Sequence, residues 1–119
     1  MTLVCIFFAS CVDQHETKHR IYDHYFVSLD PGANYQTLYY ELDDGNAIGR
    51  VSDVKRAGHI NKIIVAETNE GFYFINSEKD NQYLNSTDII GKPKNHDEFL
   101  KLIDSLNVRD FTFGYNVDK

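Results

Sequence analysis

The segment HETKH at residues 15–19 has the residue types and the spacing of a zinc-peptidase motif. On a helix, His15 and His19 would lie on one face and could bind one zinc ion, while Glu16 could activate a zinc-bound water. Such a helix needs an apolar stripe to dock it in a core, and the residues around the two histidines are polar or charged. The longer form of the motif requires Gly and His where this chain has Tyr22 and Tyr25. We therefore keep a zinc-dependent metallopeptidase only as an alternative and expect no bound metal.

A second chemical feature of the N-terminal region is Cys11, which follows an apolar run at residues 3–9. An apolar run that ends in small residues is typical of a secretory signal. The pattern FASC that ends at Cys11 resembles a bacterial lipoprotein signal, in which the cysteine is acylated and becomes the first residue of the mature chain. The resemblance implies a signal segment at residues 1–10, a lipid on Cys11 and a polar tether at residues 11–20.

The same segment has an alternative interpretation. Residues 3–9 would form the first β-strand of a soluble cytosolic interaction domain, and Cys11 would be a buried thiol, because free cysteine is often buried. The two interpretations differ in whether residues 1–20 are ordered against the rest of the domain.

The composition is that of an acidic globular domain. The chain has 119 residues, of which 42% are hydrophobic and 25% charged, and this length suits one β-rich domain at residues 21–119. The net charge of −6 argues against nucleic acid as a partner, because phosphate binding needs clustered lysine and arginine. No apolar run approaches the ~20 residues that a transmembrane helix requires.

Most of the chain after residue 20 has the composition of β-strands. β-Branched and aromatic residues form short alternating or apolar runs between turn residues. We expect strands at residues 21–29, 35–42, 47–54, 60–67 and 72–76, and residues 108–115 are the candidate for a last strand. The unbroken apolar run at residues 63–65 indicates a central strand that is covered on both faces. Short turns between sequential strands favour antiparallel pairing.

One helix is specified near the C-terminus. Asn95 and Glu98 form an N-terminal capping box, and Pro93 prevents the helix from extending backwards. The apolar residues that follow recur at helical spacing and form one stripe: Phe99, Leu102, Ile103 and Leu106. The sequence therefore predicts an α+β domain, mainly an antiparallel β-sheet with one C-terminal α-helix packed on one face.

The region from residue 50 to residue 110 carries a family resemblance. It combines NKIIV at residues 61–65, FYFIN at residues 72–76 and IGKP at residues 90–93 with the C-terminal helix. In order and pattern, these segments resemble a group of small bacterial lipoproteins that carry a domain of unknown function. The resemblance implies a location in the cell envelope and a β-rich domain, and it implies no activity.

Tyrosines are candidates for a binding surface. The chain has 8 Tyr and 8 Phe, which is more than one small core needs. Exposed tyrosine is favoured at binding surfaces, which makes Tyr39 and Tyr40 candidates. The alternative is that the tyrosines cap the sheet faces and keep their hydroxyl groups in water.

These features together predict a lipid-anchored protein of the cell membrane or outer envelope. We expect a binding or interaction module that has no enzymatic activity and no cofactor. Its expected partners are the membrane, through the lipid on Cys11, and an unidentified protein or envelope ligand.

Overall fold

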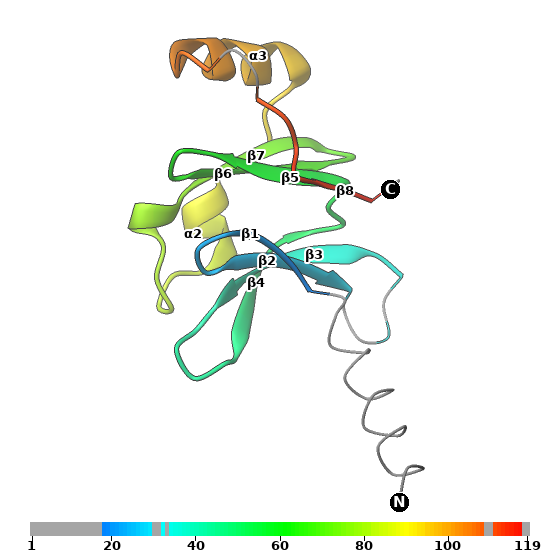
Figure 1. The fold of residues 1–119 in the computed structure, drawn as a ribbon, viewed down its shortest axis with the longest axis vertical. Helices are drawn as coiled ribbons and strands as arrows, with labels where there is room; N and C mark the ends of the chain where they lie inside the picture. Colours follow the sequence, from blue (N-terminus) through cyan, green and yellow to red (C-terminus); the bar gives the residue numbers. More distant parts are fainter. Residues whose placement is uncertain (1–17, 30–31, 33, 109–110, 118–119) are drawn as a thin grey trace, which may run out of the picture.

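Sequential hairpins build two antiparallel sheets, which lie one above the other in Figure 1. The computed structural model describes residues 18–29, 32, 34–108 and 111–117. The first sheet contains, in spatial order, β1 (His19–Tyr22), β2 (Tyr25–Leu29), β3 (Gln36–Glu41) and β4 (Ala47–Ser52). The second sheet contains, in spatial order, β7 (Gly71–Asn76), β6 (Ile63–Thr68), β5 (Arg56–Ile60) and β8 (Tyr115–Asn116).

Tight turns join neighbouring strands because their residues tolerate a positive φ angle. Asp23 has a φ of 51° between β1 and β2, and Asn61 has a φ of 52° between β5 and β6. Between β3 and β4, the carboxylate of Asp44 accepts a hydrogen bond from the backbone N–H of Asn46 at 2.9 Å. Asp and Asn are favoured at such positions because their short side chains bond to nearby backbone.

The chain passes from one sheet to the other between β4 and β5. The N–H of Val54 donates to the carbonyl of Gln36 in the first sheet at 2.9 Å. The N–H of the next residue, Lys55, donates to the carbonyl of Glu67 in the second sheet at 2.7 Å. The predicted antiparallel pairing is confirmed, but the strands form two sheets where the sequence predicted one.

The main core lies between the two sheets. It is a cluster of buried residues from both sheets: Tyr25, Val27, Leu38, Val51, Val54, Ala57, Ile64, Ala66 and Ile75. A smaller cluster joins Ile60, Val65 and Phe72 of the second sheet to Phe99. Ile64 and Val65 are neighbours in β6 and belong to different clusters, so this strand is covered on both faces, as its apolar run predicts.

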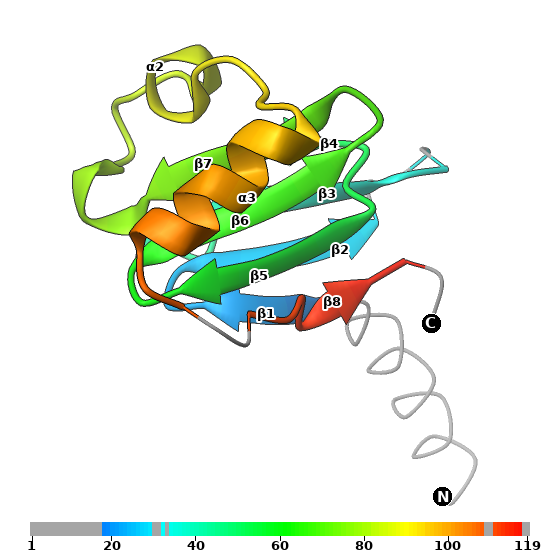
Figure 2. The same ribbon diagram turned by 90° about the horizontal axis from the view of Figure 1, so that it is seen from above.

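Three helical segments follow β7, namely the 3₁₀ helix η2 (Ser77–Lys79), α2 (Ser86–Ile90) and α3 (His96–Ser105). The predicted capping box of α3 is confirmed, because the Asn95 side chain accepts from the N–H of Glu98 at 2.8 Å and the Glu98 carboxylate accepts from the N–H of Asn95 at 3.0 Å. The five-residue helix α2 was not predicted. Figure 2 shows α3 crossing over β6 and β7.

Candidate functional site

An open groove of about 420 Å³ lies beside α3. Residues of β6 and β7 form its floor, α3 forms one wall, and α2 with the segment before it forms the other wall. The residues that line this α2–α3 groove are Ile63, Phe74, Asn76, Lys79, Leu84, Asp88, Ile89, Lys94 and Leu102. Its volume, its apolar lining and its few polar groups are typical of ligand-binding sites.

Backbone hydrogen bonds and ring stacking connect the start of α3 to β7. The N–H of Lys94 donates to the carbonyl of Phe72 at 2.7 Å, and the carbonyl of Lys94 accepts from the N–H of Phe72 at 2.8 Å. The ring of Phe99, which is 7% exposed, stacks on that of Phe72 with the two ring centroids 4.1 Å apart. Ile103 also packs against the smaller cluster, whereas Leu102 of the predicted stripe lines the groove.

The wall that contains α2 is held by a buried ion pair. The side chains of Arg50 and Asp80 are both 0% exposed, with Nη2 of Arg50 2.7 Å from Oδ1 of Asp80. Nε of Arg50 donates to the other carboxylate oxygen at 3.1 Å. The same guanidinium donates to the carbonyls of Leu84 and Asn81, each at 3.0 Å. The ion pair therefore joins β4 to the segment that enters α2.

The helix α2 is also fastened directly to the first sheet. The hydroxyl of Ser86 donates to the carbonyl of Gly49 in β4 at 2.6 Å. The carboxylate of Asp88 accepts from the N–H of Asn85 at 3.1 Å and completes a capping box. One wall of the groove thus depends on the first sheet, while the floor belongs to the second sheet.

Tyr25 completes the buried network. Its hydroxyl donates to Oδ2 of Asp80 at 2.6 Å. Burial, followed by the hydrogen bond to Asp80 and the negative charge there, raises the pKa of Tyr25 far above its ordinary value, so this phenol remains a donor. The ring of Tyr40 lies 5.3 Å from that of Tyr25, and burial followed by the charge of Asp80 raises the pKa of Tyr40 as well.

The lysines at the groove lack acidic partners. In the part of the chain that the structure describes, every lysine and arginine in residues 18–62 forms an ion pair with a carboxylate. Among the same described residues, none of the four lysines in residues 79–101 forms an ion pair, and Lys79 and Lys94 line the groove. Asp88 is the acidic residue of the lining, and its carboxylate caps α2. The groove therefore presents two lysines against one aspartate.

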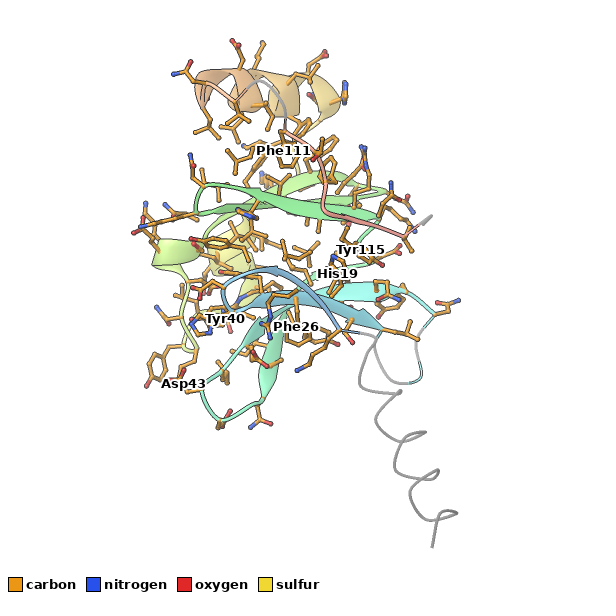
Figure 3. The ribbon with its side chains drawn as sticks, viewed as in Figure 1. His19, Phe26, Tyr40, Asp43, Phe111 and Tyr115 are labelled. Atoms are coloured by element: carbon orange, nitrogen blue, oxygen red, sulfur yellow. The ribbon has the colours of Figure 1, made fainter. Side chains whose placement is uncertain are left out.

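An open hollow of about 430 Å³ on α3 shares Lys94 and Leu102 with the groove and also includes Glu98. Two smaller and more polar hollows of about 210 Å³ each lie elsewhere. One lies between the β3–β4 hairpin and the segment after η2, and Tyr40, Asp43 and Tyr83 are among its residues. The other lies between β1 and β5, and it includes His19 and His59. Figure 3 shows Tyr40 and Asp43 at the β3–β4 hairpin, and His19 beside Tyr115 between the sheets.

The structure places Tyr39 and Tyr40 on opposite faces of the first sheet. Tyr40 packs against the main core, whereas Tyr39 stacks on Phe26 with the ring centroids 5.4 Å apart. Phe26 is 4% exposed, and Nζ of Lys18 lies 4.5 Å from the centroid of its ring. The two tyrosines therefore do not form one surface, and the binding role of either one stays a prediction.

The HETKH segment is described from Lys18 onward. His19 begins β1, two residues before the predicted start of the domain, and its ring centroid lies 5.3 Å from that of Tyr115. Cys11, His15 and Glu16 lie outside the described residues, so the lipid on Cys11 and the zinc alternative stay predictions. Within the described ranges, no group of three His, Cys, Asp or Glu side chains is placed to hold a metal.

Sequence reasoning missed most of the groove. The pattern Asn85-x-x-Asp88 before Ile89 and Ile90 is a capping signal and could have revealed α2. No local signal connects Arg50 to Asp80, because the two residues lie 30 positions apart in the sequence.

Comparisons of this chain with protein-family models, with curated proteins and with solved structures found no match. None of the helices in the described ranges is long and apolar enough to cross a membrane.

Proposed function

We propose that this protein is a non-enzymatic binding module of the bacterial cell envelope, anchored by a lipid on Cys11, and that it binds its ligand in the α2–α3 groove. The observation that carries the binding function is the open groove itself, whose lining combines apolar side chains with two lysines that have no acidic partner among the described residues. Its walls are pre-formed, which lowers the entropic cost of binding.

The proposal includes the packing that the sequence predicts for the C-terminal helix. In this proposal, α3 covers one face of the second sheet and serves as a wall of the groove. The stacking of Phe99 on Phe72 and the backbone hydrogen bonds between Phe72 and Lys94 support this role. A helix held at both its start and its centre keeps Leu102 in a fixed position at the groove.

The anchoring part of the proposal is supported by the FASC pattern and by the resemblance to small bacterial lipoproteins. Metabolic labelling with a fatty acid tests it. We expect the full-length protein to be labelled and to sediment with membranes, and Cys11→Ala to abolish both. Label that survives this substitution would exclude Cys11 as the acylated residue.

The binding part of the proposal can be tested with 8-anilinonaphthalene-1-sulfonate, an amphipathic anion that fluoresces on accessible apolar surface. We expect the native protein to bind this dye with saturation. Leu102→Gln should weaken binding about fivefold, because one partly exposed leucine contributes about 1 kcal/mol of apolar contact. Leu84→Gln tests the opposite wall in the same way.

Leu100→Gln is the matched control, because Leu100 is 50% exposed on the same helix and does not line the groove. It should leave dye binding unchanged. Thermal melting of each variant separates loss of binding from loss of fold. If the native protein does not bind the dye, or if Leu100→Gln and Leu102→Gln act equally, the α2–α3 groove is not the binding site.

A further inference from the structure

Two lysines line the α2–α3 groove, and their main chains lie near opposite ends of β7. β7 forms part of the floor of the groove. Lys94 pairs with Phe72 near the start of this strand, and Lys79 lies three residues beyond Asn76, the last residue of the strand. From Phe72 to Asn76 a strand extends about 13 Å, at about 3.3 Å per residue. Apolar side chains from β6, β7, α2 and α3 line the same groove.

The two lysines are available to an anionic ligand. Neither forms an ion pair among the described residues, and the aspartate of the lining is engaged by the N–H of Asn85. The protein as a whole carries a net charge of −6, whereas the lining of this groove contains two lysines and one aspartate. Charge complementarity favours a ligand with negative groups at two separate points.

The edge of β7 already pairs with an extended segment. The N–H and the C=O of Phe72 both bond to Lys94, so they point away from β6. Because main-chain groups alternate along a strand, the N–H and the C=O of Phe74 point towards the same edge. An extended main chain therefore suits this part of the groove.

Taking the proposed binding function of the groove as given, we propose that its ligand is an extended peptide segment of a partner protein, with an acidic residue at each end and apolar residues between them. A span of about 13 Å corresponds to about five extended residues. The terminal carboxylates contact Lys79 and Lys94, and the central side chains contact Phe74, Leu84 and Leu102. A single-chain lipid has its charge at one end only and would leave one lysine without a partner.

Isothermal titration calorimetry with the full chain and three probes tests this proposal. The first probe is an acetylated and amidated pentapeptide with glutamate at both ends and leucine, valine and leucine between them. The second has lysine at both ends, and the third is dodecanoate. We expect the acidic peptide to bind at least about tenfold more tightly than the basic one, and its affinity to fall as salt screens the charges.

Charge-removing variants locate the contacts. Lys79→Gln and Lys94→Gln should each weaken binding of the acidic peptide about two- to fivefold, which is the range for exposed ion pairs. The basic peptide should not lose affinity in these variants. Lys92→Gln is the matched control, since it removes the same charge from an exposed lysine of the same region that does not line the groove, and it should change nothing.

Four outcomes would overturn the inference. Equal binding of the acidic and the basic peptide, or equal effects of all three lysine variants, would exclude recognition by Lys79 and Lys94. Tighter binding of dodecanoate than of the acidic peptide would assign the groove to lipids and would leave the proposed binding function intact. If none of the three probes binds but the naphthalene dye does, the result excludes the peptide ligand and leaves the proposed binding function intact. If the dye does not bind either, the groove has no binding function.

Discussion

Removal of the Asp80 carboxylate tests the buried network that holds the groove. In Asp80→Ala, the guanidinium of Arg50, which is 0% exposed, loses its only counter-charge within 4.0 Å among the described residues. Three further hydrogen bonds are lost, because Asp80 accepts from Nε of Arg50, from the hydroxyl of Tyr25 and from the N–H of Asn81. The substitution therefore leaves the buried charge of Arg50 without a counter-charge and the buried hydroxyl of Tyr25 without its acceptor.

The expected magnitude follows from the burial of both side chains. Removing one partner of a buried ion pair costs about 3–5 kcal/mol, and a domain of this size has a free energy of unfolding of about 5–15 kcal/mol. We therefore expect Asp80→Ala to remove about a fifth or more of the free energy of unfolding. Adding Arg50→Met to Asp80→Ala removes the uncompensated charge. The double variant should therefore lose about 1–3 kcal/mol less free energy of unfolding than the sum of the losses of the two single variants.

The assay is urea unfolding followed by far-ultraviolet circular dichroism, with the midpoint and the slope fitted separately. Glu78→Ala is the control, because its ion pair with Lys62 has side-chain exposures of 63% and 58%. It should change the free energy of unfolding by less than about 1 kcal/mol. The reasoning is refuted if Asp80→Ala costs no more than Glu78→Ala, or if the effects of the Arg50 and Asp80 substitutions simply add.

Three further substitutions test other parts of the structure. The pKa of Tyr25 is raised in the folded state, so the stability that its protonated hydroxyl provides is complete below the ordinary pKa of 10.0 and is lost as the pH rises above that value. Tyr25→Phe should therefore flatten the fall in the free energy of unfolding between pH 9 and about pH 11, measured by urea titration. Gly71→Ala should cost more than about 1 kcal/mol in the same assay, because Gly71 has a φ of 133° and an added Cβ would lie 2.6 Å from the carbonyl oxygen of Lys94. Asn95→Ala should lower the unfolding free energy by about 1 kcal/mol, measured by thermal melting, because it removes the cap of α3, whereas Asn95→Asp should restore most of it. An unchanged melting temperature in Asn95→Ala would show that the cap does not limit stability.

The local parts of the fold could be predicted from the sequence. The start of α3 follows from Asn95 and Glu98 alone, because a capping box is complete within four residues. The central position of β6 follows from the apolar run at residues 63–65, because only a strand covered on both faces tolerates such a run in water.

The division into two sheets could not be predicted, because it depends on hydrogen bonds made by two adjacent residues. Val54 and Lys55 donate to different sheets, and nothing in their side chains distinguishes this bend from a continuing strand. Arg50 in a strand suggests a solvent-facing position, and its partner Asp80 is 30 residues away. Tyr39 and Tyr40 are neighbours in sequence and therefore suggest one surface, yet neighbours in a strand point to opposite faces.

The pairing of β8 with β5 has a consequence for the order of folding. All other strand pairs join segments that are consecutive along the chain, so each can form after the closure of a short loop. β8 instead joins Tyr115 and Asn116 to Ala57 and Arg56, across about half of the chain, through a ladder of two residue pairs. The entropy of closing so long a loop is offset, within the sheet, by only this two-pair ladder. We therefore expect this strand to dock last during folding and to detach first, and its amide protons to exchange with solvent before those of β6.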